Sequence, residues 1–134
     1  ANAGTATYGK TIDAAGYKTL TAVYWSWIDA EPYAGNTANF DRGFVQVSMD
    51  NYKGCCGATY NCGNLSNQCN TSNTNTWIAP RLAADQKHWR KVQINLNKYA
   101  GKKFQLRFRF NSGDGQHNNT TGWFVDKLRL YGTK

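Results

Sequence analysis

One segment of the chain, residues 103–110, alternates polar and apolar side chains without exception and reads Lys-Phe-Gln-Leu-Arg-Phe-Arg-Phe. Successive side chains of a β-strand point to opposite faces of the sheet, so this pattern predicts a strand with one apolar face and one basic face. The apolar side holds Phe104, Leu106, Phe108 and Phe110, and the other side holds Lys103, Gln105, Arg107 and Arg109. The apolar face must pack against a second layer, which leaves the basic face for water or a ligand.

Four further segments show the same period of two: residues 19–28, 43–49, 89–96 and 123–131. Short strands separated by Gly- and Asn-rich turns predict an all-β fold, a two-sheet antiparallel β-sandwich. We expect the turn at residues 99–102 to join two of these strands as a hairpin-like connection, with Gly101 supplying the backbone freedom. With no internal repeat or linker, residues 1–134 are expected to form a single domain.

The positive charge is concentrated in the second part of the chain. The net charge is +8, and residues 81–134 carry twelve basic residues against three acids. Such asymmetry favours an acidic partner, for example an anionic polysaccharide, an anionic cell surface or nucleic acid. The chain has no apolar run of about 18 residues, so we expect no membrane partner.

Four cysteines, Cys55, Cys56, Cys62 and Cys69, lie in one polar stretch. Their spacing does not fit the paired ligands of a zinc site, so two disulfides are the better prediction. A bridge between adjacent cysteines would be strained, and the pairing otherwise stays open. Disulfides imply an oxidising compartment, so the protein is expected to be secreted.

On the last predicted strand Asp126 shares a side with Phe124, Leu128 and Leu130. A buried carboxylate is costly unless a cation, backbone amides or a metal ion compensates its charge. Calcium binds six to eight oxygen ligands, which distant segments of a β-sandwich can supply together. Glu31 and Asp41 are the best further candidates for such a calcium site.

Several segments together resemble a known class of module: residues 40–50 (FDRGFVQVSMD), 89–96 (WRKVQINL), 99–102 (YAGK), 106–110 (LRFRF) and 122–126 (GWFVD). They are similar to the MAM-like jelly-roll modules of secreted bacterial metallopeptidases of the immune inhibitor A type. They also resemble jelly-roll carbohydrate-binding modules of polysaccharide-degrading enzymes, whose final strand often carries a calcium-binding Asp. The resemblance implies a jelly roll in a modular extracellular protein, with structural calcium. The chain departs from the pattern at residues 53–77, a cysteine-containing insertion that we expect to be disulfide-stapled.

The sequence offers little for catalysis. His88 and His117 are the only histidines and stand in no metal-ligand spacing, and no Gly-x-Ser-x-Gly motif is present. We therefore expect no enzyme activity. The remaining catalytic alternative is a lyase acting on a uronic acid polymer, in which a basic side chain neutralises the substrate carboxylate.

A binding module fits the residues better. Sugar sites combine an aromatic plate with polar groups that fix the orientation of the hydroxyls. The candidate plates are Trp25, Trp27, Trp123 and Tyr131, and the candidate polar partners are Gln46, Lys91, Gln93, Gln105, Arg107, Arg109, Lys127 and Arg129. If their strands share one sheet, these side chains line a single face that binds polysaccharide, either neutral or acidic such as pectate or alginate. A MAM-like accessory or protein-interaction module is the alternative, and secretion disfavours nucleic acid.

Overall fold

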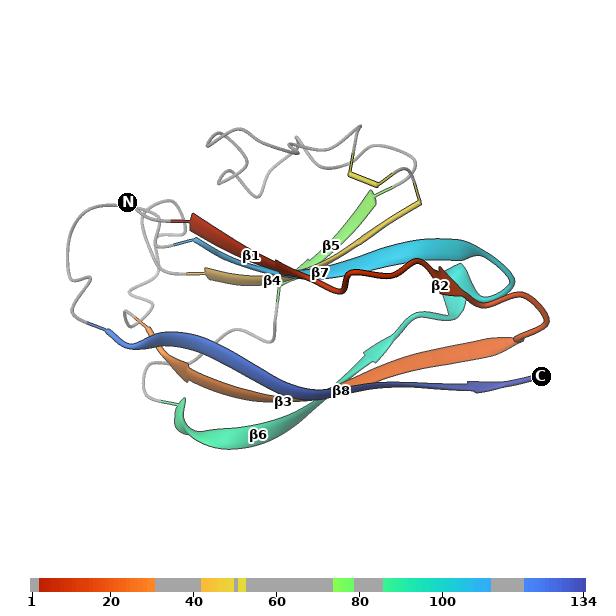
Figure 1. The fold of residues 1–134 in the computed structure, drawn as a ribbon. Helices are drawn as coiled ribbons and strands as arrows, with labels where there is room; N and C mark the ends of the chain where they lie inside the picture. Colours follow the sequence, from red (N-terminus) through yellow and green to blue (C-terminus); the bar gives the residue numbers. More distant parts are fainter. Residues whose placement is uncertain (1–2, 31–41, 50, 53–73, 79–85, 112–119) are drawn as a thin grey trace.

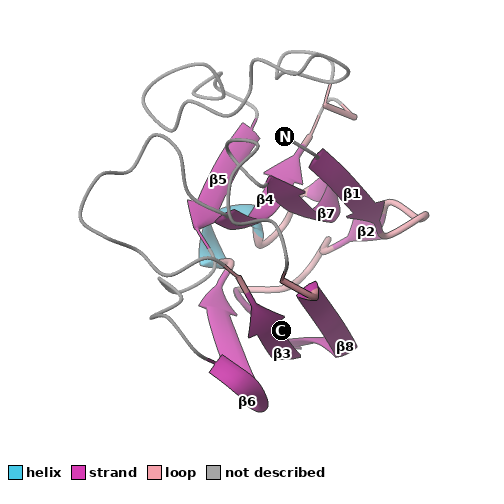
Figure 2. Ribbon diagram, turned by 90° about the vertical axis from the view of Figure 1, so that its left-hand side faces the viewer, coloured by secondary structure: helices cyan, strands magenta, loops and turns pink. Residues whose placement is uncertain are grey.

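The protein folds into two antiparallel β-sheets packed as layers of an all-β sandwich (Figures 1 and 2). The computed structural model describes residues 3–30, 42–49, 51–52, 74–78, 86–111 and 120–134. One sheet has the strand order β1-β7-β4-β5, with β2 also paired to β7, and the other has the order β6-β3-β8. The strands are β1 Ala3–Thr7, β2 Ile12–Asp13, β3 Thr19–Asp29, β4 Arg42–Ser48, β5 Thr74–Ile78, β6 Gln86–Asn95, β7 Lys103–Asn111 and β8 Gly122–Thr133.

The core lies between the two sheets and follows the predicted alternation. On β7, Phe104, Leu106 and Phe108 are buried, and Phe110 is half-buried. The three-stranded sheet contributes Leu20, Ala22, Tyr24, Ile94 and other apolar side chains to the same cluster. Tyr24 meets Phe108 edge-on, with ring centroids 5.0 Å apart, and thereby joins the two layers. The apolar side of the Lys103–Phe110 prediction is confirmed.

The segment between β6 and β7 is not the hairpin that the sequence suggested. β6 pairs with β3 in one sheet, whereas β7 pairs with β1 and β4 in the other. The chain crosses between the layers through a 3-10 turn, Asn97–Tyr99, and Gly101 then adopts a φ of 76°. Gly101 does supply the backbone freedom, but it does so in a crossover.

A β-bulge in β8 corrects the expected position of Asp126. Val23 pairs with Arg129 and Trp25 pairs with Asp126, so Tyr24 faces two residues, Lys127 and Leu128. Lys127 takes the left-handed conformation with a φ of 53°. The extra residue inverts the alternation: Trp123 and Val125 pack against the core before it, Leu128 and Leu130 after it. Asp126 is therefore exposed, and its carboxylate does not need a cation or a metal ion to compensate for burial.

Some of the predicted features lie outside the described residues. These are Glu31, Asp41, His117 and the four cysteines, together with most of the 53–77 insertion, of which β5 is described. Among the described residues, no helix is long and apolar enough to cross a membrane.

Candidate functional site: an aromatic sheet face

The predicted polar and aromatic residues do not form one surface, because their strands belong to different sheets. Gln46, Gln105, Arg107 and Arg109 belong to β4 and β7 of the five-stranded sheet. Lys91, Gln93, Lys127, Arg129 and Tyr131 belong to β6 and β8, on either side of Trp25 and Trp27 in β3. Arg107 and Arg109 are also buried rather than solvated, each with 6% of its surface exposed. The expected single basic face is thus two separate surfaces.

The three-stranded sheet carries aromatic side chains on the side away from the core. We call this surface the aromatic face and define it by Val23, Trp25 and Trp27 of β3, Lys91 and Gln93 of β6, and Phe124, Asp126, Arg129 and Tyr131 of β8. Trp25, Phe124 and Tyr131 are exposed, and Trp27 is half-buried. Side chains that alternate with these, such as Ala22 and Tyr24, belong to the core.

Strand register sets which of these groups are neighbours. Trp25 of the central strand lies between Lys91 and Asp126. Val23, two residues before Trp25 on β3, lies between Gln93 and Arg129 in the neighbouring row. Directly paired residues have their Cβ atoms about 5 Å apart. Each of these two rows therefore places an apolar side chain on the central strand between polar groups on the two edges.

Trp27 and Phe124 form the other end of the aromatic face. They are paired in register, and their ring centroids lie 5.4 Å apart in an edge-to-face arrangement. At the far end Tyr131 pairs with Thr21. From Trp27 to Thr21 the strand advances about 20 Å at about 3.3 Å per residue. The face is long enough for an extended ligand rather than a single small molecule.

Trp123, a predicted aromatic plate, faces the interior instead. Its Nε1–H donates a hydrogen bond to Ser26 Oγ at 2.8 Å, and its ring meets Phe108 edge-on at 5.7 Å. A Cβ added to Gly43 would lie 3.0 Å from the Trp123 ring, which shows how closely this indole packs on β4 of the opposite sheet. Trp123 holds the two layers together and is not part of the aromatic face.

Positive charge surrounds the aromatic face. Lys91 and Arg129 lie on it, Lys127 is exposed at the bulge, and Asp126 is its one carboxylate. Asp126 Oδ1 accepts a hydrogen bond from the Lys127 backbone N–H at 2.7 Å. At the end of β3, Asp29 forms an ion pair with Lys87 at 3.5 Å. An anionic ligand would meet a net positive surface here.

The described residues do not assemble a metal centre. Within these ranges no three His, Cys, Asp or Glu side chains come together as potential ligands. Asp126 is an exposed carboxylate engaged by its own backbone neighbour. The calcium prediction now depends on Glu31 and Asp41, which lie outside the described residues.

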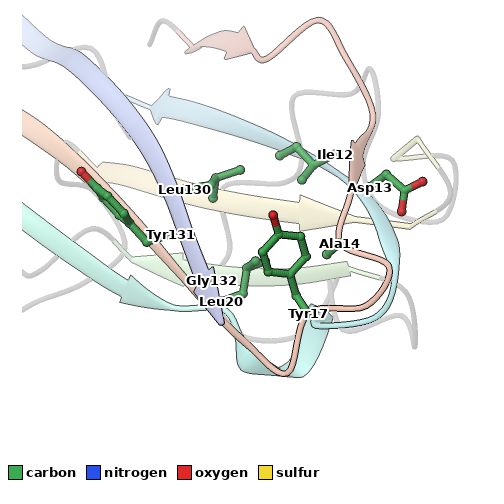
Figure 3. Close-up of a pocket in the computed structure, with 8 residues that line it drawn as sticks. All are labelled: Ile12, Asp13, Ala14, Tyr17, Leu20, Leu130, Tyr131 and Gly132. Atoms are coloured by element: carbon green, nitrogen blue, oxygen red, sulfur yellow. The ribbon is translucent and has the colours of Figure 1, made fainter. Parts of the chain in front are cut away.

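A pocket of about 340 Å³ opens beside the C-terminal end of β8 (Figure 3). Its lining comprises Ile12, Asp13, Ala14, Tyr17, Leu20, Leu130, Tyr131 and Gly132. The Ala15 N–H, 3.0 Å from Asp13 Oδ1, and the nearby Lys103 ammonium lower the pKa of Asp13. Asp13 is the one carboxylate in this lining, so the pocket lacks the second acid that paired-carboxylate chemistry requires.

Sequence reasoning missed two members of the aromatic face. The alternation of β3 correctly predicts Val23 on the side of Trp25 and Trp27, where it is a buried member of the face. An uninterrupted alternation of the last strand predicts Phe124 on the apolar side, and the bulge reverses this. The signal for the bulge was present, since Asp126 in an otherwise apolar series is a local inconsistency that one extra residue resolves.

Comparison with protein-family models, curated proteins and solved structures found no match to this chain. The resemblance to MAM-like and carbohydrate-binding modules therefore remains a prediction from short sequence segments.

Proposed function

We propose that this chain is a non-catalytic carbohydrate-binding module of a secreted modular protein, and that it binds polysaccharide along the aromatic face. The observation that carries the proposal is the group of aromatic side chains on the outer side of the three-stranded sheet, with polar side chains beside them. The aromatic residues are Trp25, Trp27, Phe124 and Tyr131, and the polar residues are Lys91, Gln93 and Arg129. Secretion, the stapled 53–77 insertion and a jelly-roll topology belong to the same proposal and rest on the sequence resemblance.

The chemistry of sugars supports this assignment. A pyranose ring presents apolar C–H groups on its faces and hydroxyl groups around its edge. An indole or phenol ring packs on the apolar face, while amide and cationic side chains reach the hydroxyls. The row Lys91, Trp25, Asp126 provides both kinds of group side by side, and the neighbouring row adds the polar groups of Gln93 and Arg129 on either side of the buried Val23.

The charge of the face favours an acidic polysaccharide over a neutral one. Arg129 can bind a uronate carboxylate through two parallel hydrogen bonds, and Lys91 adds a second positive charge across the sheet. Asp126 lies in the same row as Lys91, on the other side of Trp25, so it offsets part of the positive charge of the face without cancelling it. Pectate and alginate are accordingly the first ligands to test.

Affinity electrophoresis tests the proposal directly. We expect the protein to be retarded in gels that contain pectate or alginate, with weaker retardation by xylan and β-glucan. Raising the salt concentration should weaken the interaction with the acidic polymers, because salt screens exposed charges. Trp25→Ala should reduce the affinity about tenfold, the effect of losing about 1.4 kcal/mol at a central aromatic contact.

Tyr8→Ala is the matched control, because Tyr8 is also an exposed aromatic residue but follows β1 of the five-stranded sheet. Its retardation should equal that of the wild type. Retardation by none of the polysaccharides would exclude carbohydrate binding and leave the accessory, protein-interaction role as the surviving alternative.

A further inference from the structure

The five-stranded sheet buries polar groups on its outer side, opposite the core. Gln46 and Ser48 of β4 and Arg107 and Arg109 of β7 are all more than nine-tenths buried. They alternate with Val45, Val47, Leu106 and Phe108, which face the other sheet as part of the core. Arg107 pairs in register with Gln46, and Arg109 pairs with Phe44. Two guanidinium groups therefore lie two residues apart on the same enclosed surface.

Arg107 is held in place on two sides. Its Nε–H donates a hydrogen bond to Gln46 Oε1 at 2.5 Å. Its Cζ lies 3.8 Å from the centroid of the Tyr52 ring, which is a close cation–π contact. Its Nη2 is buried and has no hydrogen-bond partner among the residues that the structure describes. The guanidinium is fixed in orientation while one of its donor groups remains unused.

Tyr52 is itself anchored over the sheet. Asn51 and Tyr52 both adopt left-handed backbone conformations, with φ of 57° and 61°. The Tyr52 N–H donates to Ser48 Oγ at 2.8 Å, and the Tyr52 hydroxyl donates to the Gln46 carbonyl at 3.1 Å. Two strained residues held by specific hydrogen bonds indicate a defined position for the ring against Arg107.

The two buried charges lack a compensating anion among the described residues. The ion pairs found there join Lys87 to Asp29 and Lys103 to Asp13, and neither involves β7's two arginines. Burial lowers the pKa of Arg107 and of Arg109, and the charge of Arg109 lowers the pKa of Arg107 further. An enclosed cation without a counter-charge is destabilising, so a negative group at this position would stabilise the fold.

We propose that Arg107 and Arg109 form an oxyanion-binding site on the five-stranded sheet, separate from the aromatic face, in which Arg107 Nη2 donates to a carboxylate, sulfate or phosphate oxygen. Planar guanidinium groups match such oxygens geometrically and bind them through charge-assisted hydrogen bonds. The oxyanion is either the carboxylate of a uronate or a free inorganic anion. This site requires none of the residues of the aromatic face.

Isothermal titration calorimetry with sodium sulfate, sodium phosphate and sodium galacturonate, against sodium chloride at equal ionic strength, tests the site. We expect one oxyanion per chain to bind the wild type, and Arg107→Lys to weaken binding at least tenfold because lysine lacks the fork of donors. Arg90→Lys is the matched control, because Arg90 is exposed on β6 and belongs to neither site, and it should bind the same oxyanions within twofold of the wild type. Tighter binding of galacturonate would assign the site to a uronate, and tighter binding of sulfate or phosphate to an inorganic anion.

Binding of none of the three oxyanions would overturn the proposal and indicate that a carboxylate of the chain itself neutralises the pair. Unchanged affinity in Arg107→Lys would overturn it as well. If Arg107→Lys does not fold, Arg109→Lys provides the same test, with the same loss expected. Because Trp25→Ala leaves both arginines intact, it should not alter the binding of sulfate or phosphate, so failure of this site and failure of the polysaccharide proposal can be distinguished.

Discussion

At the scale of single residues, the described part of the core contains a tyrosine hydroxyl without a partner. Tyr24 is fully buried, and its hydroxyl makes no hydrogen bond to another described residue. Burial raises the pKa of Tyr24, since the phenolate would be enclosed among apolar groups. The hydroxyl of Tyr52 is also buried but donates to the Gln46 carbonyl at 3.1 Å. The hydroxyl of Tyr24 therefore destabilises the fold, whereas the hydroxyl of Tyr52 stabilises it.

Tyr24→Phe and Tyr52→Phe should change stability in opposite directions. We expect Tyr24→Phe to raise the free energy of unfolding by about 1 kcal/mol, because it removes an unsatisfied polar atom. Tyr52→Phe should lower it by about 1 kcal/mol, because it removes a buried hydrogen bond to the Gln46 carbonyl. Urea unfolding of the wild type and both variants measures these changes in the free energy of unfolding. A loss of stability in Tyr24→Phe would contradict this picture of the core.

Asp29 should make stability depend on pH. Hydrogen bonds from the backbone N–H and the hydroxyl of Thr121, each 2.9 Å from Oδ2, lower the pKa of Asp29, and Lys87 contributes less. A carboxyl group whose pKa is lower in the folded state than in the unfolded state stabilises the fold when the pH is above the unfolded pKa of about 3.9. This stabilisation is lost as the pH falls through the pKa of the folded state. Asp29→Asn should therefore melt below the wild type at pH 7, and the gap should close in acid.

Melting curves of wild type, Asp29→Asn and Lys87→Met between pH 7 and pH 2 check this dependence. Lys87→Met keeps both Thr121 hydrogen bonds, so its melting temperature should fall less than that of Asp29→Asn. A gap between wild type and Asp29→Asn that stays constant throughout this range would contradict the role of the ionised carboxylate.

At the scale of elements, the bulge in β8 determines which side chains the aromatic face contains. Lys127 has a φ of 53°, a conformation that glycine adopts without strain and a β-branched residue adopts poorly. Lys127→Gly should stabilise the protein by up to about 1 kcal/mol, and Lys127→Val should destabilise it by about 1 kcal/mol. Chemical denaturation of both variants is the measurement.

Arg129→Gly serves as the control for the bulge, because Arg129 is exposed on the same strand and pairs regularly with Val23. It should lose about 0.5–1 kcal/mol, as glycine does inside a strand. If Lys127→Gly were destabilised as much as Arg129→Gly, the left-handed conformation of Lys127 would be contradicted.

The strands were largely predictable from sequence, whereas their partners were not. Each of the five segments with a period of two became a strand, because alternation reports which side of a strand is buried. Residues 3–7 and 74–78 became strands without such a signal. The choice of sheet for β7 depends on hydrogen bonds with distant strands, such as the pairing of Phe108 with Val45, and no local pattern specifies it. Arg107 and Lys91 were therefore predicted on one surface and lie on two.

At the scale of the whole molecule, the sandwich gives its two outer surfaces different characters. The three-stranded sheet exposes aromatic and cationic side chains, whereas the five-stranded sheet encloses Arg107 and Arg109. Trp123 lies between the two sheets, where it packs on Gly43 of the opposite layer. We infer from this arrangement that an extended polysaccharide binds on one side and that an oxyanion binds independently on the other.

The indole N–H signals in a ¹H–¹⁵N spectrum test whether polysaccharide binds on the aromatic face, because the chain has only five tryptophans. The protein is titrated with soluble fragments of pectate, alginate, xylan and β-glucan. We expect a bound fragment to shift the Trp25 and Trp27 signals, while the signal of Trp123, hydrogen-bonded to Ser26 in the interior, keeps its position. Binding that leaves the Trp25 and Trp27 signals unchanged, or no binding by any fragment, would contradict the assignment of the aromatic face.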